Sequence, residues 1–156
     1  MNDAAGEDLV AIFAPILNGK VLGALCELNG LKGRVLENAA GTLAVLDVHT
    51  PHAAVTAGRV ISTYARGVQV LILDRRDGQL TVSLWRDGER QRDLPPGLVL
   101  ADAPGVVLSL ASGAQTMEDI AATHPDKVFE ARRSRWSGFW ALQRLARQAK
   151  REAPGA

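Results

Sequence analysis

The chain has 156 residues, of which 47% are apolar and 22% are charged, and its formal net charge is +1. This length is typical of one domain and is sufficient to bury a hydrophobic core without metal or disulfide support. The composition is that of a soluble globular protein and excludes a wholly disordered chain. A single cysteine, Cys26, excludes an internal disulfide and a cysteine-based zinc site.

The sequence contains no apolar run near the roughly 18 residues that a membrane crossing requires. Residues 1–8 are acidic, whereas a secretory signal begins with basic residues. We therefore expect a cytoplasmic protein without a transmembrane segment. The abundance of arginine, alanine and leucine is typical of bacterial coding bias, so we also expect a bacterial origin.

Residues 7–18 are predicted to form a short N-terminal helix. Four apolar residues follow the spacing i, i+3, i+4 and i+7, which places them on one helical face: Leu9, Ile12, Phe13 and Ile16. Acidic residues at the start suit the helix dipole, and Asn18-Gly19 suits the C-terminal end. Pro15 argues against a regular helix, because proline removes a backbone hydrogen bond.

Residues 20–100 are predicted to form strands separated by turns. Hairpin signals, two of them Asp-Gly turns, join 33–37 to 42–49, 68–74 to 80–85, and 80–85 to 89–94. Further strands are expected at 55–64, 98–100 and 106–110. Successive antiparallel strands of this spacing form a meander or close into a small barrel.

From Ser112 the pattern becomes helical. The segment from Thr116 to Asp119 resembles a capping box before a short helix that ends near Ala122. A second, longer helix is predicted from about Thr123 to Arg151.

These elements together predict an α+β fold: an antiparallel β-meander or small barrel with an N-terminal helix and a C-terminal helical arm. The β-rich domain with its N-terminal helix would span residues 1–111. The C-terminal helical segment, residues 112–153, would pack on the same domain.

Charge is unevenly distributed along the chain. Residues 126–156 carry eight Lys or Arg and three Asp or Glu, whereas the remaining residues carry ten and fourteen. On the predicted terminal helix, a narrow basic stripe lies beside an apolar arc and consists of Arg133, Trp140, Arg144, Arg147 and Arg151. Arginine binds phosphate, and tryptophan stacks on unpaired bases. The leading hypothesis is therefore a non-enzymatic nucleic-acid-binding protein, in which the arginines contact phosphates and Trp140 stacks.

Packing accounts for much of the same helix, because Phe129, Trp136 and Phe139 would cover the sheet while the arginines remain solvated. A second hypothesis is a protein-interaction or assembly module that forms a homodimer or docks on a partner through this helix. Membrane-surface contact is disfavoured, because Gly138 weakens an isolated helix by about 1 kcal/mol relative to alanine.

One local cluster, Asp47, His49 and His52, suits a metal or a small ligand. Asp47 and His49 would lie on the same side of a strand, and a bend at Pro51 would bring His52 close. Imidazole and carboxylate groups bind zinc and other divalent ions. A third hypothesis is therefore a small-ligand or metal-binding domain centred on these residues, although a solvated strand end is the simpler interpretation.

The sequence contains no nucleotide-binding glycine loop and no known catalytic signature. We therefore expect no cofactor and no enzymatic activity.

Overall fold

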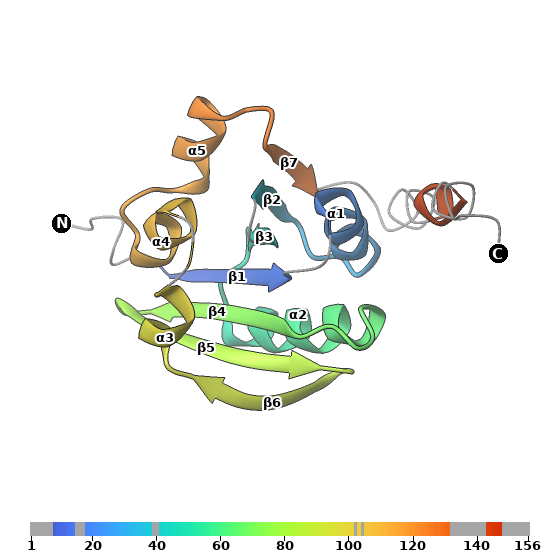
Figure 1. The fold of residues 1–156 in the computed structure, drawn as a ribbon, viewed down its shortest axis with the longest axis horizontal. Helices are drawn as coiled ribbons and strands as arrows, with labels where there is room; N and C mark the ends of the chain where they lie inside the picture. The colour runs from blue at the N-terminus through green and yellow to red at the C-terminus, as the bar shows by residue number, and fades with distance from the viewer. Residues whose placement is uncertain are drawn as a thin grey trace.

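The computed structural model describes residues 8–14, 18–38, 41–101, 103, 105–131 and 143–147. They form one sheet with helices on both of its faces (Figure 1). The strands are β1 Leu9–Ala14, β2 Gly33–Asn38, β3 Gly41–Leu46, β4 Val70–Arg76, β5 Gln79–Arg86, β6 Glu89–Leu94 and β7 Val128–Ala131. The helices are α1 Gly19–Leu28, α2 Pro51–Tyr64, α3 Pro96–Leu100, α4 Gly105–Ser112 and α5 Met117–Thr123, and residues 143–147 form a further short helix. The predicted α+β class is confirmed.

The sheet is open and has the strand order β6-β5-β4-β1-β3-β2-β7, with every neighbouring pair antiparallel. The first four strands and two helices follow the βαββαβ order of the ferredoxin-like, or split βαβ, motif. β5 and β6 extend this unit at one edge, and β7 extends it at the other. Because such motifs host many unrelated functions, the fold alone assigns none.

Two hydrophobic cores lie on opposite faces of the sheet. The first core joins α1 and α2 to the sheet and contains Leu22, Ile61 and Trp85. The second core joins α3, α4 and α5 to the other face and contains Leu73 and Leu110. The molecule therefore has three layers, in which the C-terminal helices cover the face that the βαββαβ helices leave open.

The predicted hairpins are confirmed. Asp77-Gly78 connects β4 to β5, and Asp87-Gly88 connects β5 to β6. All four residues have positive φ, between 51° and 84°. This conformation matches the twist of a two-residue hairpin and favours Asp-Gly sequences.

β1 corrects the predicted N-terminal helix. It is a strand between β3 and β4, and its side chains enter the two cores alternately, with Val10 and Ile12 in the first and Ala11 in the second. A strand covered on both faces is apolar at nearly every position. The helical spacing arose because almost any spacing within such a run selects apolar residues.

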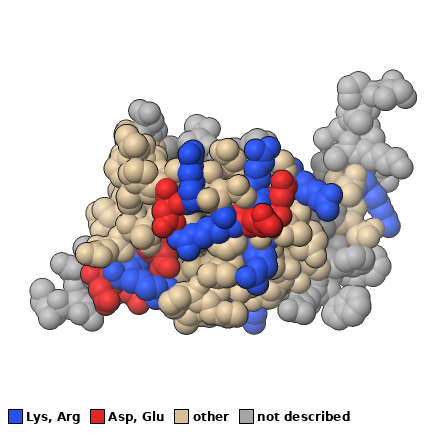
Figure 2. Space-filling model, turned by 90° about the horizontal axis from the view of Figure 1, so that it is seen from below, with Lys and Arg blue, Asp and Glu red and all other residues tan. Residues whose placement is uncertain are grey.

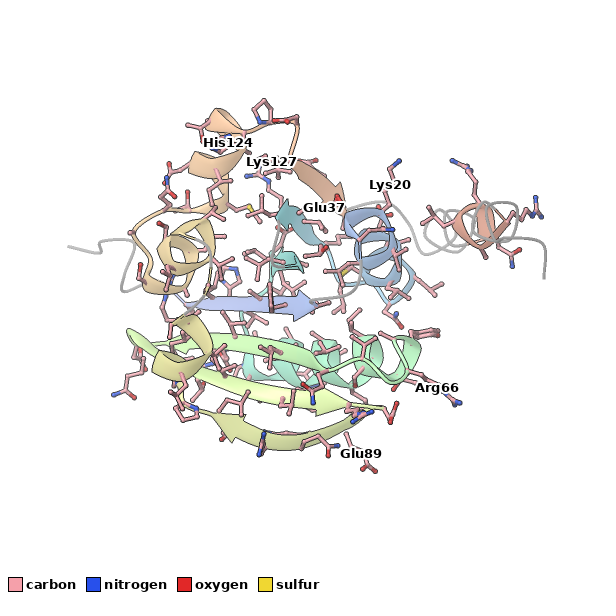
Figure 3. All side chains as sticks on the ribbon, viewed as in Figure 1. Lys20, Glu37, Arg66, Glu89, His124 and Lys127 are labelled. Atoms are coloured by element: carbon pink, nitrogen blue, oxygen red, sulfur yellow. The ribbon has the colours of Figure 1, made fainter. Side chains whose placement is uncertain are left out.

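The Asn18-Gly19 pair begins a helix instead of ending one. The Asn18 side chain accepts the Val21 N–H at 2.8 Å, and the Glu37 carboxylate of β2 accepts the Gly19 N–H at 2.9 Å. Glu37 lies beside the first turn of α1 in Figure 3. These contacts satisfy backbone donors that the first turn of a helix leaves unpaired.

Residues 55–64, predicted as a strand, belong to α2. Thr50 caps this helix, since its Oγ1 accepts the Ala53 N–H at 3.1 Å, and Pro51 stands in the first turn. Residues 98–100 and 106–110, also predicted as strands, lie in α3 and α4. Short apolar runs do not distinguish a strand from a buried helix by spacing alone.

α5 confirms the predicted short helix and its capping box. Thr116 Oγ1 accepts the Asp119 N–H at 3.2 Å, and the Asp119 carboxylate accepts the Thr116 N–H at 2.9 Å. The continuous helix predicted from Thr123 is wrong, because α5 ends there and β7 pairs with β2. Most of the remaining predicted helix lies outside the described residues, although residues 143–147 are helical.

Candidate functional site

A pocket of about 480 Å³ lies between one end of the sheet and the connection from α4 to α5. Its apolar lining consists of Leu9, Val45, Leu46, Leu110 and Met117. Its polar lining consists of Asp8, Arg34, Asp47, His49, Arg75, Gln115, Thr116 and Glu118. Small-molecule sites are concave and combine apolar walls with convergent polar groups, and this pocket has both.

The sheet register brings the two pocket arginines to one face. Arg34 pairs with Val45, Val45 pairs with Ala11, and Leu9, two residues before Ala11, pairs with Arg75. Paired residues and residues two apart share a face of a sheet. Arg34 and Arg75 therefore flank the pocket from β2 and β4, separated by three strand spacings, roughly 14 Å, across the sheet and offset by two residues along the strands.

Arg75 connects the sheet to α4. Its side chain is buried, and Nη1 donates to the carbonyl oxygens of Leu110 and Ala111, at 2.9 Å each. These carbonyls lie in the last turn of α4, where a positive charge is favourable, and the Leu110 oxygen also accepts the Gly113 N–H at 3.2 Å. Arg75 thereby holds α4 in place and also brings a guanidinium into the pocket wall.

Three carboxylates, those of Asp8, Asp47 and Glu118, lie on exposed residues around the pocket. Asp8 also accepts the Asp77 N–H at 3.2 Å and forms a 3.5 Å ion pair with Arg76. The Arg75 guanidinium is therefore buried in the pocket wall, Arg34 is partly exposed, and the three carboxylates belong to exposed residues.

The orientation of His49 is fixed by a backbone carbonyl. Its Nε2 lies 2.7 Å from the Leu46 oxygen. A carbonyl only accepts, so Nε2 carries a proton, and in the neutral ring Nδ1 is then the acceptor. The neutral His49 ring therefore has its one acceptor at Nδ1.

No protein-family model, no curated protein and no solved structure matches this chain.

None of the helices in the described part of the chain has the length and apolar character that a membrane crossing requires.

In the structure, His52 of the predicted metal cluster lies apart from Asp47 and His49. Asp47 and His49 both line the pocket, whereas His52 lies exposed in the first turn of α2, 3.5 Å from Thr56 Oγ1. Within the described ranges, no three His, Cys, Asp or Glu residues gather closely enough to hold a metal ion. Of the three predicted residues, the structure therefore brings only Asp47 and His49 together.

The predicted nucleic-acid stripe is described in part. Arg144 and Arg147 are exposed on the helix of residues 143–147. Arg133, Trp140 and Arg151 lie outside the described residues.

Sequence reasoning missed both pocket arginines. In β4 the side chains of Leu71, Leu73 and Arg75 alternate onto one face, so an arginine occupies the position of a core residue. A charge at a core position of an apolar strand is a signal that could have identified Arg75. Arg34 gives no comparable signal, because its ion pair with Glu130, at 3.7 Å, depends on the β2–β7 pairing.

Cys26 is not part of the pocket. It belongs to α1 and lies in the first hydrophobic core. Its burial, together with the neighbouring Glu27 carboxylate, raises the pKa of the thiol to about 12. In this environment Cys26 serves as a small buried apolar residue.

Proposed function

We propose that this protein is a small-ligand-binding domain and that the pocket between the sheet and the α4–α5 connection is its binding site. The supporting observation is the convergence of Arg34, Asp47, His49 and Arg75 on a cavity of about 480 Å³ whose lining is partly apolar and partly polar. The apolar lining would hold the body of a ligand, and the polar groups would fix its orientation. This function corresponds to the small-ligand hypothesis raised by Asp47 and His49.

A binding role fits these groups better than nucleophilic catalysis. The pocket hydroxyl, Thr116 Oγ1, accepts the Asp119 N–H as the cap of α5. The thiol of Cys26 lies beneath the opposite face of the sheet, and its raised pKa of about 12 disfavours the reactive thiolate.

The proposal is tested by filling the pocket. Val45 lines the cavity and is partly exposed, so Val45→Phe should occupy its volume. A matched control is Val55→Phe, which places the same side chain on the exposed side of α2. Amide NMR spectra would be recorded with a mixture of small organic acids, amines and amino acids as probes.

We expect probe-dependent shifts that cluster at residues 46–49 and 115–118 in the wild type and in Val55→Phe, and that are lost in Val45→Phe. Both variants must first retain a cooperative thermal transition. Shifts that are absent in the wild type, or that persist unchanged in Val45→Phe, would overturn the proposed site.

Nucleic-acid binding remains a second candidate, supported by the exposure of Arg144 and Arg147. The charge distribution in Figure 2 does not add to this support. On the face shown there, Lys and Arg side chains lie among Asp and Glu side chains. The test is binding of labelled single-stranded and duplex DNA across a salt series, for the wild type and for Arg144→Ala with Arg147→Ala. Loss of two phosphate contacts should reduce the slope of log K against log salt by about 2, and an unchanged slope would contradict the candidate.

Self-association is a third candidate, and light scattering of the same samples tests it. Edge strand β6 is exposed and rich in charge, with an Arg90–Asp93 ion pair. Charged residues on edge strands oppose edge-to-edge pairing, so the geometry supports this role less than it supports ligand binding.

A further inference from the structure

The two guanidinium groups of the pocket already have partners within the protein. Arg75 Nη1 donates to the carbonyl oxygens of Leu110 and Ala111, and Arg75 takes part in a further interaction. Arg34 is paired with Glu130, with 3.7 Å between Nε and the carboxylate. Both positive charges are therefore compensated before a ligand enters.

The carboxylates of the pocket are compensated in the same way or lie in water. Asp8 pairs with Arg76 at 3.5 Å and accepts the Asp77 N–H, and Asp47 takes part in an interaction of its own. Within the described ranges, the Glu118 side chain forms no ion pair or hydrogen bond, but Glu118 is exposed. An ion pair with an exposed carboxylate contributes little.

This pairing disfavours a charged ligand. Transfer of an ionised group out of water is unfavourable unless an opposite charge and hydrogen bonds compensate it. A ligand carboxylate at Arg75 would compete with two backbone carbonyls for Nη1. A ligand ammonium would compete with Arg76 for Asp8, or would remain in water beside Glu118. An uncharged ligand meets none of these costs.

Gln115 offers the pocket hydrogen bonds without a charge. It lines the cavity and is partly exposed, and its side-chain amide has no hydrogen-bond partner among the residues that the structure describes. A side-chain amide has two donor hydrogens and one acceptor oxygen. A ligand carboxamide can therefore donate to the Gln115 oxygen and accept from its nitrogen at the same time.

The pocket also accommodates an apolar group. Leu9, Leu110 and Met117 line it and are buried. A hydrocarbon group placed against them would lose contact with water, which is favourable in proportion to the area covered. Methionine adapts to irregular shapes because its chain is unbranched and flexible.

On the basis of the proposed ligand-binding function, we propose that the pocket binds an uncharged molecule with an apolar body and a carboxamide-like head. The head exchanges hydrogen bonds with the Gln115 amide, and the body occupies the apolar lining. The paired charges of the wall stay paired, and Gln115 determines the specificity.

The test adds uncharged molecules to the probes and compares three that share one hydrocarbon group. They are 4-methylpentanamide, 4-methylpentanoate, in which a carboxylate replaces the amide, and 4-methylpentylamine, which carries an ammonium. Each is titrated into the full chain and followed by the amide shifts of residues 46–49 and 115–118. We expect the carboxamide to bind about tenfold more tightly than either ion, because the ions find no unpaired opposite charge inside the pocket.

Variants at Gln115 then test its role. Gln115→Leu should weaken carboxamide binding by about tenfold and leave the binding of the two ions unchanged. Gln115→Glu places an unpaired negative charge in the pocket and should make the ammonium probe the tightest of the three.

The matched control is Gln69→Leu. Gln69 is exposed and directly precedes the first residue of β4, whereas the pocket residue Arg75 lies near the other end of that strand. Gln69→Leu should leave the binding of all three probes unchanged.

The outcomes separate this inference from the function on which it rests. If either ion binds as tightly as the carboxamide, or if Gln115→Leu binds the carboxamide as the wild type does, the pocket is a ligand site but the proposed specificity is wrong. The same conclusion follows if other probes shift the pocket amides and the carboxamide does not. If no probe shifts them, both the specificity and the binding function fail.

Discussion

The two faces of the sheet are built differently. Beneath α1 and α2 the core is apolar and tightly fitted, and Trp85 lies directly against Gly58. Beneath α3, α4 and α5 the core is smaller. The buried Arg75 lies beside this core, and the pocket adjoins it.

The difference follows from the order of the chain. On the first face, each helix directly connects two strands of the βαββαβ unit, so its position is set by both neighbours. On the second face, the helices come from a later segment that begins after β6 and returns to the sheet only at β7. We infer that the first face provides most of the stability and that the second face provides the site.

The largest expected loss of stability comes from a substitution at Gly58, in the packing between α2 and the sheet. A Cβ atom there would lie 2.3 Å from Cε2 of Trp85, too close for either the helix or the indole ring to remain in place. Gly58→Ala should therefore lower the free energy of unfolding by about 3 kcal/mol, at the upper end for overpacked cores. Chemical denaturation measures the loss.

The matched control for Gly58 is Gly97→Ala in α3, where an added Cβ meets nothing within 4 Å. Stability should stay the same or rise by up to about 1 kcal/mol, because alanine favours a helix. Equal destabilisation by both variants would contradict the difference between the two faces.

The second prediction concerns the contacts between Arg75 and α4 on the other face of the sheet. Arg75→Met removes the donations to Leu110 and Ala111 and should cost about 2–3 kcal/mol, as expected for hydrogen bonds from a charged group. Hydrogen exchange should accelerate mainly in α4 and α5, and much less in α1 and α2. The control is Arg66→Met, an exposed residue near the opposite end of the sheet (Figure 3), which should change stability by less than about 0.5 kcal/mol. Uniform acceleration across the molecule would show that the two faces open together.

The third prediction uses the buried thiol of the first face. The unfolded Cys26 thiol ionises near pH 9, and the folded one near pH 12. Between these values the unfolded state binds fewer protons, so stability falls as pH rises, by up to about 1.4 kcal/mol per pH unit from this group. Below pH 9 the group contributes no pH dependence.

Urea denaturation across pH 9–11 measures this slope, and Cys26→Ala should reduce it. The folded wild type at pH 8 should also resist thiol reagents, and labelling should require unfolding. Rapid labelling of the folded protein at that pH would contradict the burial of Cys26.

The smallest expected effect is at the capping box of α5. Thr116→Ala removes the side-chain acceptor for the Asp119 N–H and should cost about 1 kcal/mol. Thr123→Ala, at the other end of the same helix, is the control and should change stability by less than about 0.5 kcal/mol. If the control is the more damaging variant, the cap does not determine where α5 begins.

Local signals in the sequence predicted part of this fold. The hairpins that join β4, β5 and β6 were predicted from Asp-Gly pairs, because the positive φ that their turns require limits which residues fit. The capping box at Thr116 was also predicted from local sequence, because its two hydrogen bonds join residues only three positions apart. Such features need no knowledge of the rest of the chain.

Features that depend on distant contacts were missed. β1 was predicted as a helix because only its pairing with β3 and β4 makes it a strand, and β7 depends on its pairing with β2. Residues 55–64 of α2 were predicted as a strand, although Thr50-Pro51 is a local helix-start signal, because a short apolar run does not distinguish a strand from a helix by spacing alone. In the site, Asp47 and His49 were selected from the sequence, but Arg34 and Arg75 join them only through the sheet register.

The attachment of Arg75 to α4 has a thermodynamic consequence. The segment from α4 to β7 is held to the sheet at one end by Arg75 and at the other by the β2–β7 pairing. A ligand that contacts Arg75, Arg34 and the start of α5 would bind only when this segment is in place. Its binding free energy would therefore stabilise the segment against local opening, so hydrogen exchange in α4 and α5 should slow in proportion to ligand occupancy while exchange in α1 and α2 stays constant.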